Sequence, residues 1–190
     1  YEPFNEVNIR KSYSIPDDFY ILVHVANLYS VKNHLELFKE LNKLKNKFVI
    51  FIIGHPSGDN YYVDSVIDFC NKNKNFIHIP GLNRETVFSF IKQSDLLLLP
   101  SKGEGFPNVI LEAMALSTPW VITPTCGAAV NLAGGIVSDL CNFSAYIDWL
   151  LENIIYRDIL GTLGYLHWES CFQWNKIVNT WCELILDEPL

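Results

Sequence analysis

The feature that most constrains the fold is a series of short apolar segments that alternate with amphipathic helical patterns. The apolar segments are continuous, and each is four to seven residues long; they cover residues 20–26, 48–53, 76–79, 96–99 and 120–123, with a weaker sixth at 136–137. A continuous apolar run predicts a strand that is covered on both faces. Strands that alternate with helices predict a parallel sheet with right-handed crossovers, so we expect an α/β Rossmann-like sheet of about six strands.

Helical patterns separate these runs. The segment Asn33-His34-Leu35-Glu36 resembles a capping box that opens an amphipathic helix ending near Leu44. Residues 61–71, a segment capped by Asn83, and residues 108–116 give three more helices. After about Ser138 the patterns are helical only.

The C-terminal segment therefore forms a helical addition to the sheet. Its helices are expected at residues 143–153, 157–170 and 175–186, and they carry Trp149, Trp168, Trp174 and Trp181. We expect these tryptophans to pack the helices against the sheet or against a partner.

Composition limits the classes of partner. The chain has 190 residues, of which 49% are hydrophobic, which suits one domain with a sizeable core. The formal net charge of −7 argues against nucleic acid as a partner and against direct contact with anionic membranes. No apolar run approaches the roughly 18–20 residues that span a bilayer, and no signal peptide is recognisable. The five cysteines form no CxxC pair, and reduced thiols in a cytoplasmic protein are the favoured interpretation.

The first residues differ from the rest. Residues 1–18 are polar, contain Pro3 and Pro16, and resemble a linker, so the domain is expected at 19–190. The chain begins at Tyr1, and Met114 is its only methionine. We therefore expect a fragment or an excised domain.

Two glutamates eight positions apart mark the best candidate site. Glu104 lies in the glycine-containing loop that follows the run 96–99, and Glu112 interrupts an apolar helical pattern. A strand, a turn and a helix start can hold an anion on backbone N–H groups, and a carboxylate beside it suits a ligand with hydroxyls. The alternatives are a solvated loop glutamate for Glu104 and a narrow exposed helix stripe for Glu112.

Three further residues are candidates on position alone. Lys32 precedes a helix and could face a phosphate, Gly54 could let a ligand approach the backbone, and Arg84 could reach a base or a phosphate. A surface lysine, a plain turn and a surface arginine are the respective alternatives. The histidines show no metal-ligand spacing and no DxD pair is present, so we expect no metal.

These residues together resemble a known family. The spacing Glu104-x7-Glu112 within Pro100-Ser101…Gly105-Phe106-Pro107…Leu111-Glu112-Ala113-Met114-Ala115 looks like the signature of family 4 retaining glycosyltransferases, the glycosyl transferases group 1, which have the GT-B fold. Val25–His34, Ile52-Ile53-Gly54, Ile79-Pro80-Gly81 and Thr123…Gly127 are similar to the family's other loops. Phe172-Gln173-Trp174 shows a weaker similarity to the start of the family's last helix. The resemblance implies that this chain is one half of a GT-B fold, the C-terminal half that binds a UDP- or GDP-sugar donor.

The resemblance also implies roles for single residues. Glu104 would contact the donor sugar as the catalytic residue, Glu112 would bind the ribose hydroxyls, and Lys32 would face the diphosphate. Asn27 stands where many members carry an arginine that pairs with that lysine, so half of the clamp is missing. The backbone near Gly81 would meet the base. The remaining donor-binding residues implied are Gly54, Arg84, Ser101, Gly105, Phe106, Pro107, Asn108 and Val109.

We therefore expect the donor-binding part of a metal-independent hexosyltransferase without a resident cofactor, in polysaccharide or glycoconjugate assembly. The acceptor would be held by an N-terminal domain absent from this chain. The full enzyme would be cytoplasmic, with peripheral attachment to the inner face of the membrane as an option. Two alternatives stay open: a GT-B sugar-nucleotide epimerase, and a non-catalytic module that binds a nucleotide-sugar or a protein.

Overall fold

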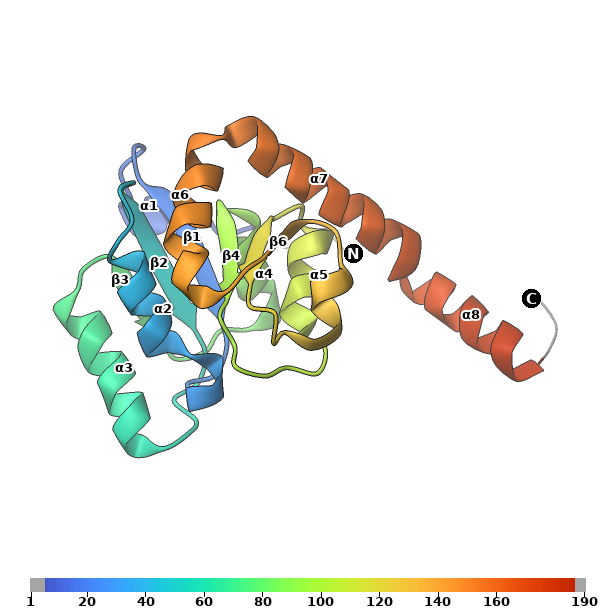
Figure 1. Cartoon of the computed structure of the whole chain (residues 1–190), viewed down its shortest axis with the longest axis horizontal. Coiled ribbons are helices and arrows are strands. Elements are labelled where there is room, and N and C mark those ends of the chain that lie inside the picture. Colours follow the sequence, from blue (N-terminus) through green and yellow to red (C-terminus); the bar gives the residue numbers. More distant parts are fainter. Residues whose placement is uncertain (1–5, 187–190) are drawn as a thin grey trace.

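The structure is a computed structural model that describes residues 6–186 (Figure 1). Its centre is a six-stranded, all-parallel sheet of strand order β3-β2-β1-β4-β5-β6. The strands are β1 Tyr20–Val25, β2 Phe48–Ile53, β3 Phe76–Ile79, β4 Leu96–Leu99, β5 Trp120–Ile122 and β6 Gly135–Val137. Every residue of β2 and β4 is buried. The predicted α/β Rossmann-like class is confirmed, including the weak sixth strand.

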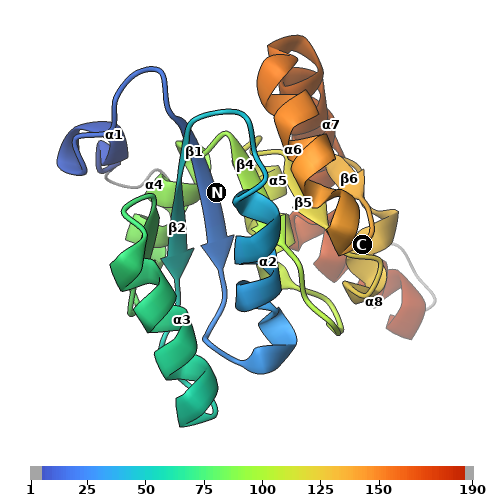
Figure 2. The ribbon, with the colours of Figure 1, turned by 60° about the vertical axis from the view of Figure 1, so that its left-hand side comes forward.

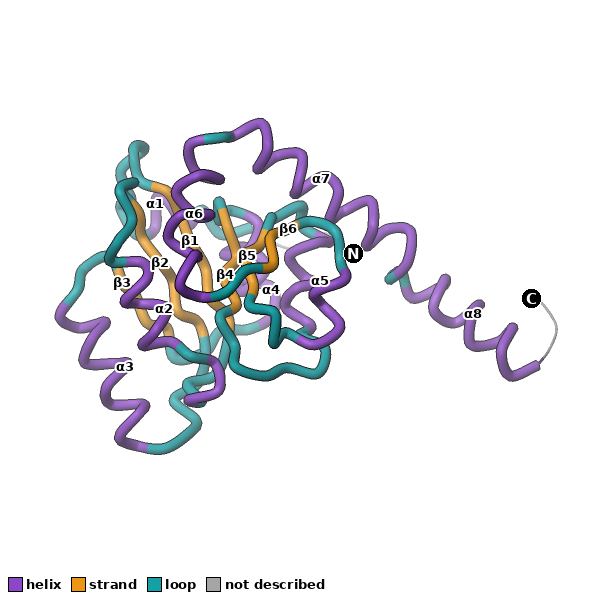
Figure 3. Tube along the Cα trace, viewed as in Figure 1, coloured by secondary structure: helices purple, strands orange, loops and turns teal. Residues whose placement is uncertain are grey.

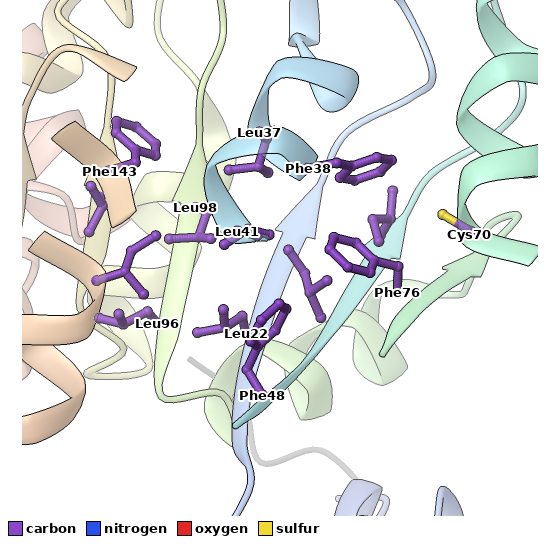
Figure 4. Close-up of a cluster of buried hydrophobic side chains, with 14 of the residues drawn as sticks. Leu22, Leu37, Phe38, Leu41, Phe48, Cys70, Phe76, Leu96, Leu98 and Phe143 are labelled. Atoms are coloured by element: carbon purple, nitrogen blue, oxygen red, sulfur yellow. The ribbon is translucent and has the colours of Figure 1, made fainter. Parts of the chain in front are cut away.

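Helices cover both faces of this sheet (Figure 2). One face carries α2 His34–Leu41, α3 Asn60–Lys72 and α6 Phe143–Glu152, and the other carries α1 Ile9–Ser12, α4 Arg84–Lys92 and α5 Asn108–Ala115. Three short 3-10 helices lie in loops: Ser30–Lys32, Gly127–Asn131 and Leu140–Asn142. The two faces bury separate hydrophobic clusters, one of which is drawn in Figure 4. There Leu22, Leu98 and Phe38 are fully buried, and each such side chain contributes about 1.5–3 kcal/mol to folding.

The last two helices behave differently from each other. Helix α7, Ile154–Cys171, packs along α5 and beside β6, whereas α8, Trp174–Leu186, points away from the sheet (Figure 3). Trp168 on α7 packs against the core as predicted. Trp174 and Trp181 on α8 are 77% and 61% exposed, so they do not cover the sheet.

Two expectations for local structure change. Asn33 has a left-handed backbone (φ 64°) and its side chain does not cap α2, so the predicted capping box is wrong. The Asn33 side chain instead donates to the carbonyl of Pro100, 3.2 Å away. In the expected linker, Ile9 and Ile15 are buried in the core, and the Ile9 N–H donates to Gln93. Residues 7–18 therefore pack on the domain, while residues 1–5 lie outside the described part.

A buried histidine pair holds the loop that follows β1. His24 Nδ1 lies 2.8 Å from the carbonyl oxygen of Leu98, and its ring centroid is 4.7 Å from that of His34. Tyr62 accepts a hydrogen bond from the His34 backbone N–H at 2.9 Å. Burial lowers the pKa of His24 to about 4 and, with a smaller effect of His24 itself, lowers the pKa of His34 to about 2. Both rings are therefore neutral in the folded protein.

We expect acid to destabilise the fold through this pair. Folded-state pKa values below the unfolded value near 6.5 mean that stability is complete above that pH and is lost as the pH falls toward 4. Each histidine should add a slope of about 1.4 kcal/mol per pH unit below pH 6.5. His24→Asn keeps an N–H for the Leu98 carbonyl and should remove the contribution of His24 to the pH dependence of the free energy of unfolding. Urea unfolding between pH 7 and pH 5 measures this, and equal slopes in both proteins would contradict it.

Gly127 holds two loops together at the carboxyl end of the sheet. It has φ +58°, and a Cβ there would stand 1.9 Å from the carbonyl oxygen of Gly105. Gly127→Ala should therefore lower the free energy of unfolding by about 1–3 kcal/mol, since both the φ value and the contact are strained. A Cβ at Gly103 meets nothing within 4 Å, so Gly103→Ala is the matched control. Thermal unfolding of the two variants should separate them clearly; similar melting temperatures would refute the contact.

Candidate functional site

The candidate site lies at the topological switch point of the sheet, where the strand order reverses between β1 and β4. Strands β1 and β4 are neighbours, yet β2 continues the sheet on one side and β5 on the other. A crevice forms at such a point, beyond the carboxyl ends of the strands. The two loops that border it are tied together, because the Lys102 N–H donates to the carbonyl of Val31 at 2.8 Å.

An ion pair joins these two loops. Lys32 Nζ, from the loop after β1, lies 2.6 Å from Glu104 Oε1, from the loop after β4. The Ser101 hydroxyl donates to the same carboxylate oxygen at 2.6 Å. The side chains of Lys32 and Glu104 are 23% and 11% exposed. The structure thus brings the predicted Lys32 of one loop against the predicted Ser101 and Glu104 of another.

The second glutamate lies on the exposed side of α5. Glu112 Oε1 is 3.5 Å from Arg84 Nη2, and Arg84, at the start of α4, is largely exposed. Burial raises the pKa of Glu112, and the charge of Arg84 opposes that rise. Glu112 is therefore a half-buried carboxylate whose cationic partner compensates its burial only in part. Such a group can accept hydrogen bonds from a polar ligand.

A groove of about 850 Å³ opens beside Glu112. One wall comes from α4 and α5, and the other from the junction of α7 and α8; it is lined by Arg84, Asn108, Leu111, Glu112, Trp168, Phe172, Gln173, Trp174 and Asn175. The residues of the second wall were not predicted as site residues. The weaker family similarity at Phe172-Gln173-Trp174 was the sequence signal that could have identified this wall.

The start of α5 offers backbone donors to an anion. The helix begins at Asn108, with Pro107 in the cap position and no side-chain hydrogen bond to the first turn. Asn108 is exposed, Val109 is half-buried, and Pro107 is buried. The first N–H groups of a helix and its dipole favour a negative ligand at this place.

Three predicted residues support the loops rather than face the ion pair. Asn27 Oδ1 accepts a hydrogen bond from the His55 backbone N–H at 3.0 Å. At Gly54 a Cβ would stand 2.0 Å from the carbonyl oxygen of Ala26, so only glycine lets these loops cross so closely. Gly81 has φ +120°, and the ring of His55 lies against it.

The loop that carries Glu104 is held by hydrogen bonds from the loop that follows β5. Hydroxyls of Thr123 and Thr125 both donate to the carbonyl of Ser101, at 2.6 and 2.5 Å. The carbonyl of Gly105 accepts from the Ala128 N–H, and the ring of Phe106 lies 6.1 Å from that of Phe172. The two threonines are supports that the sequence interpretation did not single out.

Two features are absent from residues 6–186, the part of the chain that the structure describes. Within them, no three histidine, cysteine, aspartate or glutamate side chains gather as a metal ion requires. Nor does any helix in that range have the length and apolar character needed to cross a bilayer.

Comparisons with known proteins agree with the resemblance. The capsular polysaccharide biosynthesis glycosyltransferase CapM of Staphylococcus aureus is 26% identical over 184 residues, which cover 92% of this chain and 47% of CapM. The uncharacterized glycosyltransferase MJ1178 of Methanocaldococcus jannaschii is 30% identical over 129 residues, or 64% of this chain and 36% of that protein. The chain thus spans less than half the length of these relatives.

Solved structures share the fold. Anabaena HepE in complex with UDP-glucose superposes with a TM-score of 0.81 at 16% identity, covering 95% of this chain and 52% of HepE. The chain therefore has the fold of one half of a GT-B protein, as expected. The family model described as Glycosyl transferases group 1 matches residues 5–164, which is most of the sequence. This chain belongs to the glycosyl transferases group 1 family.

Proposed function

We propose that this chain is the donor-binding half of a retaining glycosyltransferase. It binds a nucleotide-diphosphate sugar, and the whole protein transfers that sugar to a saccharide or glycoconjugate acceptor in polysaccharide assembly. The acceptor would be held by a further, N-terminal domain, and the protein would work in the cytoplasm. CapM, whose name places it in capsular polysaccharide synthesis, supports this direction.

The observation that carries the proposal is the presence of two polar centres, one that includes the loop before α5 and one that includes α5 itself. Lys32, Ser101 and Glu104 form one centre, and Glu112 with Arg84 forms the other. A nucleotide sugar has matching parts in series: sugar hydroxyls, a diphosphate and ribose hydroxyls. Lys32 and the N–H groups of α5 suit the diphosphate, Glu104 the sugar, and Glu112 the ribose.

The proposed chemistry depends on orientation and electrostatics. The lysine charge and the helix dipole stabilise the negative charge that develops on the leaving diphosphate. Binding of the sugar between Glu104 and that diphosphate aligns its anomeric carbon for attack by an acceptor. We propose that no metal ion is needed, because Lys32 and the helix start supply the positive charge.

One observation favours a second candidate, a non-catalytic module. Asn27 occupies the position of the expected arginine, and its side chain is bound to the loop after β2. Only one cation of the clamp therefore remains in the first loop. An intact protein that binds the donor but releases no nucleoside diphosphate in the presence of acceptor saccharides would favour the module.

Calorimetry with a panel of UDP- and GDP-sugars in excess EDTA tests donor binding directly. We expect one base class to bind, with a dissociation constant unchanged when Mg²⁺ replaces EDTA. UDP-glucose is the first compound to test, since HepE was solved with it. If no nucleotide sugar binds, both the enzyme and the nucleotide-binding module are excluded for this chain.

The role of Glu112 has a sharper test. Glu112→Gln should weaken the binding of UDP, or of GDP if the panel favours guanosine, about tenfold, because a charge-assisted hydrogen bond to ribose is lost. The same substitution should matter much less for the 2′-deoxy nucleotide. Glu85→Gln, an exposed carboxylate in the first turn of α4, is the matched control. Equal losses for the ribo and deoxy forms would overturn the assignment to ribose.

A further inference from the structure

The carboxylate of Glu104 already neutralises the lysine that the diphosphate would need. Glu104 Oε1 lies 2.6 Å from Lys32 Nζ, and the pair is largely shielded from water. The backbone around Glu104 is fixed, since its N–H donates to the carbonyl of Thr125 at 3.0 Å. Only the glutamate side chain is free to change its partner.

We propose that Glu104 is an exchangeable stand-in for the donor diphosphate, and that its release selects complete donors over free nucleoside diphosphate. This inference rests on the proposed function. When a diphosphate takes Lys32, the Glu104 carboxylate loses its cation and keeps only the Ser101 hydroxyl as a donor, so it gains from new hydrogen-bond donors. The hydroxyls of an attached sugar supply them, whereas a nucleoside diphosphate without a sugar supplies none.

The exchange has a consequence for turnover. Free diphosphate competes with an anion that is tethered beside Lys32 at high effective concentration. A nucleotide sugar faces the same competitor but offers Glu104 a replacement contact. After transfer, the sugar leaves with the acceptor, and the Lys32–Glu104 pair re-forms as the diphosphate departs. The pair therefore weakens binding of the product more than binding of the donor.

The decisive variant is Glu104→Gln. An amide holds Lys32 through a neutral hydrogen bond, which is about half as strong as the charge-assisted one, so UDP should bind on the order of tenfold more tightly. The advantage of UDP-sugar over UDP should shrink by a similar factor. If the panel selects guanosine, GDP and its sugar serve as the probes. Circular dichroism and thermal unfolding confirm that the variant is folded.

The chain offers a closely matched control. Glu40 is 10% exposed and pairs with Lys43 at 2.5 Å, yet it lies near the C-terminal end of α2, where the Ser144 hydroxyl also contacts it. Glu40→Gln removes the same charge from a similar setting and should leave UDP affinity unchanged. In a Lys32→Ala background, only the repulsion between the carboxylate and the diphosphate remains, so Glu104→Gln should give a smaller gain in UDP affinity than it gives when Lys32 is present.

Each outcome decides between the proposals. A gain for Glu104→Gln that shrinks without Lys32 supports the exchange, and a gain of the same size with and without Lys32 overturns it. Unchanged or weaker UDP binding by Glu104→Gln, with binding still dependent on Lys32 and Glu112, overturns the exchange but leaves the proposed function standing. Absence of nucleotide binding by the wild-type chain overturns both.

Discussion

The structure depends on a sheet that is buried on both faces. Because every residue of β2 and β4 is buried and apolar, these strands carry no polar side chain, and the polar groups at this edge of the sheet come from the loops and helices beyond the strands. The order of the strands reverses between β1 and β4, so the loops that follow these two strands border one crevice. Lys32 and Glu104, which are 72 positions apart, meet at 2.6 Å for this reason. The site is thus a consequence of how the core is covered.

Glycines at two close backbone contacts let the loops at this edge of the sheet pack against each other. At Gly54 and Gly127 a Cβ would stand 2.0 and 1.9 Å from a neighbouring carbonyl oxygen, which is far inside van der Waals contact. Threonine hydroxyls and the Asn33 amide then bind carbonyls of the loop after β4. This network holds the loop of Glu104 through backbone carbonyls and not through the Glu104 carboxylate. The carboxylate can therefore exchange its partner while the loop stays in place.

Much of the fold could be predicted because its signals are local. The apolar runs predict β2, β3 and β4 to the residue, and Asn83 caps α4 as its sequence position indicates. The two glutamates stood out for the same reason: each is a charge in an unusual sequence environment. Their roles came from a family resemblance, and no physical argument from the sequence alone could have assigned them.

What the sequence did not reveal is set by tertiary contacts. The sequence around Asn33 matches a capping box, but the left-handed backbone of Asn33 does not place its side-chain oxygen on the first turn of α2, and its NH2 group donates to the Pro100 carbonyl. The aromatic wall of the groove was missed because it forms only where the end of α7 and the start of α8 lie beside α5 in the folded chain. Spacing within a helix carries no record of such a tertiary contact.

The two glutamates differ in the charge that faces each one, and that difference argues for separate roles. Glu104 is paired at 2.6 Å with a lysine of which 23% is exposed, so its carboxylate is already satisfied. Glu112 is 3.5 Å from an arginine that is 75% exposed, and its burial is only partly compensated. A ligand hydroxyl gains most at an uncompensated carboxylate, while a ligand anion needs a cation, which here it must take from a carboxylate that is already paired. The first condition describes Glu112, and the second describes the Lys32–Glu104 pair.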